Sequence, residues 1–303
     1  MQKMTSKYFT DKLALDIPWV ESPFFYELLK NSDLTEEQKQ LCTQFHEEGY
    51  VTIDLDISDE EIQTVIDEMY AALEDERTTF HADHFTYTPS KRIFEHWKKS
   101  LPIAKLTVHP SVMNALELLY ARKPFPFSTI NFIKGSNQPY HSDAVHFHTV
   151  PALWMAGVWV ALEDVDETNG ALRIIPGSHK WPVYEYQNLN LPHPDSIEDG
   201  EAVNYAEYER FLDALIATHN KPAKYVKLKK GQALIWAANM MHGGANVPGV
   251  TDLNRTRLTQ ANHYFFEGCE HYFHPMFSEP RHGKYATKWC SDTNNIKTYL
   301  DSL

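Results

Sequence analysis

Short runs of β-branched and aromatic residues fill the chain from about residue 127 onward, and this pattern limits the possible fold more than any other feature. Gly, Pro, Asn and Asp separate the runs, as expected for strands joined by turns. Asn169-Gly170 lies between two runs and predicts a hairpin, because both residues tolerate positive φ. The pattern predicts an antiparallel sandwich or jelly roll with strands at 128–133, 157–162, 171–175, 225–228, 233–236 and 257–266.

The first third of the chain has the pattern of helices. Thr35 with Gln38, and Ser58 with Glu61, have the spacing of capping boxes, in which side chains satisfy amides at a helix start. Apolar residues recur at helical spacing after Ser58, and another helix is expected near Ser111. We expect these helices to pack against the strands and to carry no chemistry.

Length and composition favour one elaborated domain. The chain has 303 residues, with 43% hydrophobic and 23% charged residues, which is typical of a globular protein. We expect a mainly β fold with flanking α-helices. Its parts are a mainly helical segment at about 1–125, a jelly-roll core at about 126–270 with an insertion at 181–220, and a tail at 271–303. The insertion either covers a site or is a surface excursion.

Charge and cysteine content narrow the function. A formal net charge of -13 disfavours nucleic acid or an anionic membrane as partner and favours a small-molecule substrate. Three widely spaced cysteines suit neither a disulfide framework nor a four-ligand zinc site. The first twenty residues lack the apolar stretch of a signal peptide. A cytoplasmic location is therefore expected. The lysines between 221 and 230 are interpreted as a solvated strand face.

The segment His141-Ser-Asp143 carries the main chemical prediction. Residues i and i+2 of a strand project to the same face, so both side chains can reach one metal ion. His242, at the end of an apolar strand and before two glycines, is the candidate third ligand. Two histidines and one carboxylate form the facial triad of non-haem Fe(II) oxygenases, with three open coordination positions.

Two other site interpretations stay open. With 16 histidines in the chain, a His-x-Asp tripeptide can arise by chance. A zinc hydrolase using His141, His146 and His242 is one alternative. A non-catalytic, cupin-like jelly roll that binds a ligand or metal is the other.

An Fe(II) oxygenase that uses 2-oxoglutarate also needs a partner for the far carboxylate of the oxoacid. Arginine suits this role because it makes two parallel hydrogen bonds. Arg257 and Thr259 share a strand face, and Arg255 is the reserve candidate. Asn131, on the strand expected at 128–133, is also expected to bind 2-oxoglutarate. Near the ligands, the side chains expected to line a substrate pocket are Tyr140, His146, His148 and Trp159, with Trp154 and Trp236 as further aromatic neighbours.

Roughly residues 40 to 266 resemble the phytanoyl-CoA dioxygenase family of Fe(II)/2-oxoglutarate oxygenases. The resemblance is carried by the His141 motif, the run from Gly157 to Lys180, the His242-Gly-Gly turn and the Arg257 strand. It implies a double-stranded β-helix (jelly-roll) core with flanking helices. It also implies Fe(II) at His141, Asp143 and His242, an arginine that holds 2-oxoglutarate, and dioxygen as the oxidant. Either Arg255 or Arg257 can be that arginine.

The resemblance also implies a reaction type. Family relatives that halogenate lack the carboxylate ligand, so Asp143 favours hydroxylation with release of succinate and carbon dioxide. Desaturation, ring formation, demethylation and epimerisation use the same oxidant and stay open. His179, in a Pro-Gly-Ser-His turn, is expected to be structural.

Overall fold

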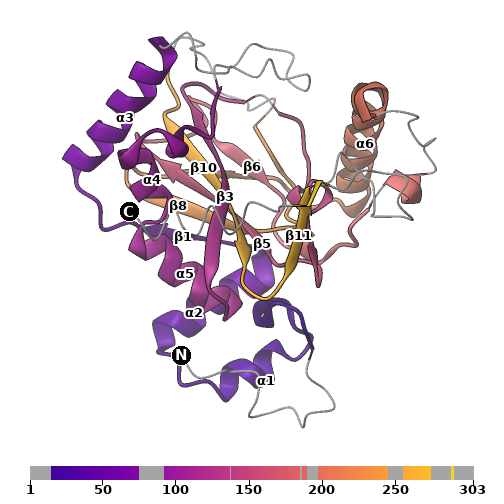
Figure 1. Ribbon diagram of the computed structural model, residues 1–303. Helices are drawn as coiled ribbons and strands as arrows, with labels where there is room; N and C mark the ends of the chain where they lie inside the picture. The colour runs from indigo at the N-terminus through magenta and orange to yellow at the C-terminus, as the bar shows by residue number, and fades with distance from the viewer. Residues whose placement is uncertain are drawn as a thin grey trace.

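A computed structural model describes residues 15–74, 92–136, 138–184, 186–189, 197–244, 255–273 and 288–289 (Figure 1). The α-helices are α1 (Phe25–Lys30), α2 (Glu36–Glu48), α3 (Asp59–Glu74), α4 (Leu101–Thr107), α5 (Pro110–Tyr120) and α6 (Ile197–His219). The short 3-10 helices are η1 (Trp19–Glu21), η2 (His96–Lys98), η3 (Asp143–Val145), η4 (Ser178–Lys180) and η5 (Tyr186–Leu189). The strands are β1 (Tyr50–Asp54), β2 (Arg92–Phe94), β3 (Pro124–Phe132), β4 (Phe147–Val150), β5 (Met155–Ala161), β6 (Leu172–Ile174), β7 (Lys224–Val226), β8 (Gln232–Ala237), β9 (His242–Gly243), β10 (Thr259–Phe266), β11 (Glu270–Phe273) and β12 (Lys288–Trp289).

Six strands form the main sheet in the order β1-β8-β5-β10-β3-β2, and every neighbouring pair is antiparallel. Two three-stranded sheets, β12-β11-β4 and β7-β6-β9, accompany it. All seven residues of β5 are buried, as expected for an apolar strand covered on both faces. The expected class, a jelly roll that is mainly β with flanking helices, is confirmed.

Alternation along β5 shows what covers each face of the main sheet. Val158 and Val160 belong to a core cluster with apolar residues of α2, α3, α4 and α5. Trp159 and Ala161 point to the other face, into a cluster that includes Leu172 of β6. Helices therefore cover one face of the main sheet, and the small sheet that contains β6 covers the other (Figure 1).

The predicted helix starts are confirmed. Thr35 Oγ1 accepts a hydrogen bond from Gln38 N–H at 3.2 Å, and Gln38 Oε1 accepts one from Thr35 N–H at 3.0 Å. Ser58 and Glu61 make the same exchange, at 3.2 and 2.9 Å. In both helices, side chains satisfy amides that have no partner within the helix. The next predicted start, near Ser111, corresponds to α5.

The hairpin predicted at Asn169-Gly170 is wrong. The strand before it, β5, belongs to the main sheet, whereas β6 belongs to the small sheet with β7 and β9. The dipeptide lies in the connection between sheets, where Gly170 has φ of 96° and Asn169 is not left-handed. Asn169 instead uses its side chain, which accepts from Asp166 N–H at 2.9 Å and donates to the Asp164 carbonyl at 3.0 Å. A local turn preference does not identify which strand comes next.

Segments outside 126–270 also build the sheets. β1 and β2, from the first third of the chain, form the two edges of the main sheet. In the tail, β11 and β12 extend the sheet that contains β4, and most of 271–303 lies outside the described residues. In the insertion, α6 buries Tyr208 and Leu212 in a small apolar cluster.

Lysines of the run at 221–230 pair with carboxylates at the surface. Lys229 pairs with Asp164 at 2.7 Å, and Lys230 pairs with Asp59 at 2.6 Å. The prediction of a solvated strand face is thus met only in part, because Lys224 lies on β7 and the other lysines of the run lie outside strands. Within the described ranges, no helix has both the length and the apolar character needed to cross a membrane.

His179 has the structural position that its turn predicts. Its side chain is 4% exposed, and its Nε2 lies 3.1 Å from the His46 carbonyl oxygen. Gly49 leaves room for the ring, because a Cβ at this position would lie 2.3 Å from His179 Nδ1. Burial lowers the pKa of His179 to about 4, so the ring is neutral at pH 7.

We predict that His179 contributes to the acid sensitivity of the fold. The unfolded chain binds a proton on this ring near pH 6.5, whereas the folded chain does so only near pH 4. The free energy of unfolding therefore falls as the pH drops through this window, by up to about 3 kcal/mol from this group. Urea unfolding of wild type and His179→Gln between pH 8 and 4 measures the effect. The variant should show the shallower pH dependence, and equal slopes would contradict the assignment.

Candidate metal centre

A backbone bridge brings two histidines together from distant parts of the chain. His141 N–H donates to the His242 carbonyl at 2.9 Å, and His242 N–H donates to the His141 carbonyl at 3.0 Å. His242 begins β9, which pairs with β6, so the bridge extends the small sheet. The two imidazole rings lie 4.2 Å apart, measured between centroids.

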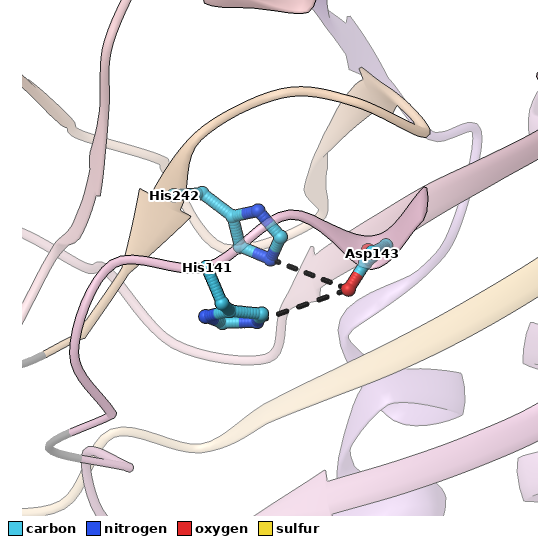
Figure 2. A group of neighbouring side chains, drawn as sticks. All are labelled: His141, Asp143 and His242. Carbon is cyan, nitrogen blue, oxygen red and sulfur yellow. Dashed lines mark ion pairs between the residues drawn. The ribbon is translucent and has the colours of Figure 1, made fainter. Parts of the chain in front are cut away.

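Asp143 completes the group, although not from the continuous strand that we expected. Ser142 is extended, with φ of -117° and ψ of 134°, and this single residue puts His141 and Asp143 on one side. The chain then turns into η3, where Ser142 Oγ accepts from Ala144 N–H at 3.3 Å. Asp143 Oδ1 lies 3.8 Å from Nε2 of each histidine (Figure 2).

Carbonyl groups orient both imidazole rings toward Asp143. His141 Nδ1 lies 3.1 Å from the Pro139 carbonyl oxygen. His242 Nδ1 lies 2.9 Å from the Met240 carbonyl oxygen. Because a carbonyl only accepts hydrogen bonds, Nδ1 carries the hydrogen in each ring and the Nε2 lone pair is available. Figure 2 shows both Nε2 atoms turned toward the carboxylate.

The protonation states of the group suit a divalent metal ion. Burial, and then the electrostatic interaction with the nearby His242 ring, hold the pKa of His141 well below its usual range. Burial acts to raise the pKa of Asp143, but neighbouring histidines and an indole N–H outweigh it, so the pKa is lowered and the carboxylate is ionised. The three donor atoms lie within 4.8 Å of one another. This donor set fits non-haem Fe(II).

Close backbone contact explains Gly243, the first glycine after the distal histidine. A Cβ on Gly243 would lie 2.7 Å from the Pro139 carbonyl oxygen. Gly244 N–H donates to the Gln138 carbonyl at 2.9 Å. The segment that leads into His141 therefore packs directly on the backbone after His242, and only glycine fits there.

A cavity of about 280 Å³ lies beside the three donors, between the main sheet and the smaller sheets. Its wall includes Ile130, Phe132, Trp159 and Trp236 from the main sheet, and Leu172 and His242 from the small sheet. The metal group and a buried arginine, Arg257, share this cavity.

Arg257 has the position expected of an anion anchor. It is 2% exposed, its Nη1 donates to the Gly170 carbonyl at 2.9 Å, and its guanidinium lies 5.3 Å from the centroid of the Trp159 ring. Burial, and then the positive charge of Arg92, lower the pKa of Arg257 to about 9, so it is charged at pH 7. Arg257 Nε and Thr259 Oγ1 are buried with no hydrogen-bond partner among the described residues. A bound carboxylate would relieve the cost at Arg257, which lines the cavity. Thr259 follows it on the same strand face but is not itself among the lining residues.

Arg255, the reserve candidate, lies away from the cavity. Its side chain is 40% exposed, donates to Thr168 Oγ1 and lies 3.9 Å from Asp166 Oδ1. The structure therefore places Arg257, and not Arg255, in the cavity wall.

Asn131 lies on the wrong face of β3 for the role that we expected. Ile130 and Phe132, its neighbours on the strand, line the cavity, so Asn131 points to the helix side. Its Nδ2 donates to Gln260 Oε1 at 3.0 Å, and Gln260 Nε2 donates to Thr107 Oγ1 of α4 at 2.9 Å. Asn131 thus joins a buried polar network between the main sheet and a helix.

The four residues expected around a substrate divide evenly. His146 and Trp159 line the cavity. Tyr140 lies in a different apolar cluster, with its ring centroid 4.0 Å from the Arg173 guanidinium. His148 follows the cavity-lining Phe147 on β4 and therefore projects to the other face.

The ligand set of the zinc alternative is not the one that the structure assembles. Among the described residues, the group that could hold a metal contains Asp143 rather than His146. The ring centroids of His141 and His146 lie 6.4 Å apart. Burial lowers the pKa of His146 to about 4, so this ring is a neutral, polar part of the cavity wall.

Two ionisable side chains of the cavity wall, His263 and Arg92, were not predicted from the sequence. His263 Nε2 lies 3.9 Å from Asp143 Oδ2. It follows Arg257 and Thr259 on the same strand face, so the alternation that selected those two residues also indicates His263. Arg92 lines the cavity from β2, a strand of three residues that is too short to recognise from its pattern.

Comparison with known proteins identifies the family. The family model described as phytanoyl-CoA dioxygenase (PhyH) matches residues 45–249. The chain belongs to the phytanoyl-CoA dioxygenase family. The resemblance proposed from the sequence is thus confirmed, and the matched range contains His141, Asp143 and His242.

Similarity to individual proteins is distant. Phytanoyl-CoA dioxygenase, peroxisomal, from Rattus norvegicus is 23% identical over 268 residues, which are 82% of this chain and 73% of that protein. Phytanoyl-CoA dioxygenase domain-containing protein 1 from Danio rerio is 37% identical over 83 residues, and the match spans 26% of this chain but only 28% of that protein. Among solved structures, the epimerase SnoN in complex with Fe3+, alpha ketoglutarate and nogalamycin RO has a TM-score of 0.56 and 20% identity, covering 77% of this chain and 85% of that one. This last likeness shows a shared fold.

We predict that Asn131→Ala reduces stability and leaves oxoacid binding unchanged. The substitution removes the hydrogen-bond donor to Gln260 Oε1 and leaves this buried oxygen without a partner in the network. This loss should lower the free energy of unfolding by about 1 to 3 kcal/mol. Urea unfolding measures this change, and calorimetric titration with 2-oxoglutarate in the presence of metal measures affinity. Thr259→Val, which removes a hydroxyl on the cavity face, is the contrasting variant and should weaken affinity. A loss of oxoacid affinity in Asn131→Ala at unchanged stability would contradict the assignment.

Proposed function

We propose that the protein is an Fe(II)- and 2-oxoglutarate-dependent dioxygenase that hydroxylates an unactivated C–H bond of a small molecule and releases succinate and carbon dioxide. One observation carries the proposal. The donors of His141, Asp143 and His242 share a single cavity with Arg257, a buried cation that pairs with no carboxylate of the described residues. A metal-binding module needs the first feature but has no use for the second.

The chain's own residues then have separate tasks. His141, Asp143 and His242 hold the iron, which together with the oxoacid and dioxygen supplies the oxidising power. Arg257 grips the far carboxylate of 2-oxoglutarate, and the Thr259 hydroxyl adds a hydrogen bond from the same strand face. The mostly apolar lining lowers the local dielectric constant, which strengthens these electrostatic contacts.

The dimensions of the cavity support a compact substrate. Sites for drug-sized ligands occupy roughly 300 to 1,000 Å³. The cavity of about 280 Å³ lies below this range and must also hold the oxoacid. A small molecule, or a small reactive end of a larger one, fits better than a bulky group enclosed as a whole.

The similar proteins support the proposed iron and 2-oxoglutarate, but they do not select hydroxylation over other reactions. The SnoN structure is described as a complex with Fe3+ and alpha ketoglutarate, and that protein is an epimerase. Asp143 supports hydroxylation over halogenation, because the carboxylate occupies the position that a halide needs. The choice between hydroxylation and the other outcomes depends on the substrate.

The proposal extends to the organisation and location of the protein. We infer a single oxygenase domain, because β1 near the N-terminus and β10 near residue 260 belong to one sheet. A cytoplasmic location is supported by the three widely spaced cysteines, which suit a reducing compartment better than a disulfide framework.

The test is an anaerobic titration with Fe(II) and 2-oxoglutarate, followed by the weak visible band of the metal-oxoacid chelate. Wild type should show the band, and Asp143→Ala and His242→Ala should not. Arg257→Ala should raise the dissociation constant of 2-oxoglutarate by roughly 10- to 100-fold, the scale of a charge-assisted pair. Arg255→Ala is the matched control and should behave as wild type, since its guanidinium pairs at the surface.

The other outcomes distinguish the alternatives. If folded wild-type protein bound Fe(II) but no oxoacid, the cupin-like binding module would replace the proposal. Turnover in the absence of dioxygen would favour the zinc hydrolase.

A further inference from the structure

The two oxygens of the Asp143 carboxylate have different surroundings. Oδ1 faces the Nε2 atoms of His141 and His242, each at 3.8 Å. Oδ2 accepts a hydrogen bond from the Trp236 indole N–H at 2.8 Å. His263 Nε2 lies 3.9 Å from Oδ2, beyond hydrogen-bond distance. Within the described part of the chain, the indole is therefore the single hydrogen-bond donor to this oxygen.

The position of the indole is fixed by the main sheet. Trp236 on β8 is 3% exposed and lies directly opposite Gly157 on β5. A Cβ on Gly157 would lie 2.1 Å from the Trp236 ring, so the indole lies against the bare glycine backbone. The absence of a side chain at residue 157 thus makes the space that the ring needs to reach Asp143.

The hydrogen bond from Trp236 to Asp143 Oδ2 affects how many coordination positions a bound metal ion would have open. Two histidines and a carboxylate bound through one oxygen leave three positions of an octahedron. A 2-oxoglutarate chelate uses two of them, and dioxygen needs the third. Carboxylates bind metal ions through one oxygen or through both. If Asp143 bound through both, its second oxygen would fill the position that dioxygen needs.

We propose that Trp236 is a positioning residue that holds Asp143 Oδ2 away from the metal, so that one coordination position stays open for dioxygen. The proposal rests on the proposed function. Gly157 makes the position of the Trp236 indole possible, because it leaves the space that the ring occupies. If Trp236 only packed the core, its substitution would weaken binding of 2-oxoglutarate and binding at the open position to the same degree.

Trp236→Phe tests the proposal, because it removes the N–H and keeps an aromatic ring. Two properties are measured on anaerobic protein: formation of the Fe(II)-2-oxoglutarate chelate by its visible band, and binding of nitric oxide, a dioxygen surrogate, by electron paramagnetic resonance. Chelate formation should stay close to the wild-type level, whereas nitric oxide affinity should fall roughly tenfold or more, the scale of one hydrogen bond to a charged group.

Trp97→Phe is the matched control. This indole is also buried, and its N–H also donates to a carboxylate, Glu95 Oε2 at 3.1 Å, but it belongs to the core on the helix side. Both measured properties should match those of wild type. The control thus separates a general effect of losing a buried indole from an effect specific to Asp143.

Gly157→Ala is an independent second variant, which keeps the N–H but displaces the ring that carries it. It should show the same split between chelate formation and nitric oxide affinity, so the test does not depend on the folding of Trp236→Phe alone. An equal loss of both properties, or a loss of neither, would overturn the proposal. Absence of the chelate in wild type would remove the proposed function, and this proposal with it.

Discussion

The backbone bridge between His141 and His242 is the contact on which the site depends. Two hydrogen bonds, at 2.9 and 3.0 Å, join segments that are far apart in the sequence and fix both histidines in one register. The same pairing brings Gly243 against the Pro139 carbonyl, which excludes any side chain there. Because His242 is also part of the small sheet through β6, the ligand geometry is tied to the packing of the small sheet on the main sheet.

Charge balance links this bridge to the rest of the cavity. A buried carboxylate and a buried guanidinium face one space of about 280 Å³, and no direct ion pair joins them among the described residues. Burial of unpaired charges is costly, so the protein alone is electrostatically incomplete. A divalent cation at Asp143 and a dicarboxylate between the metal and Arg257 would complete it. The proposed cofactors thus answer a physical need of this cavity.

The sequence predicted the parts of the site that depend on local rules. Alternation across one extended residue placed His141 beside Asp143, even though the strand around them is not continuous. Alternation also put both Arg255 and Arg257 on the face expected to meet the cofactor. Long-range packing decided between them, because Arg255 pairs with Asp166 at the surface and Arg257 lines the cavity. The role expected for Asn131 was wrong because the face that a strand turns to a cavity depends on neighbouring strands. The contact between Trp236 and Asp143 joins different segments, and no local pattern indicates it.

Anomalous X-ray diffraction at the iron edge, from crystals grown anaerobically with Fe(II) and 2-oxoglutarate, tests the central claim most directly. The account predicts one iron peak between His141, Asp143 and His242, the far carboxylate of the oxoacid against Arg257, and Asp143 bound through Oδ1 alone. Iron at another position, or an oxoacid that does not reach Arg257, would contradict it.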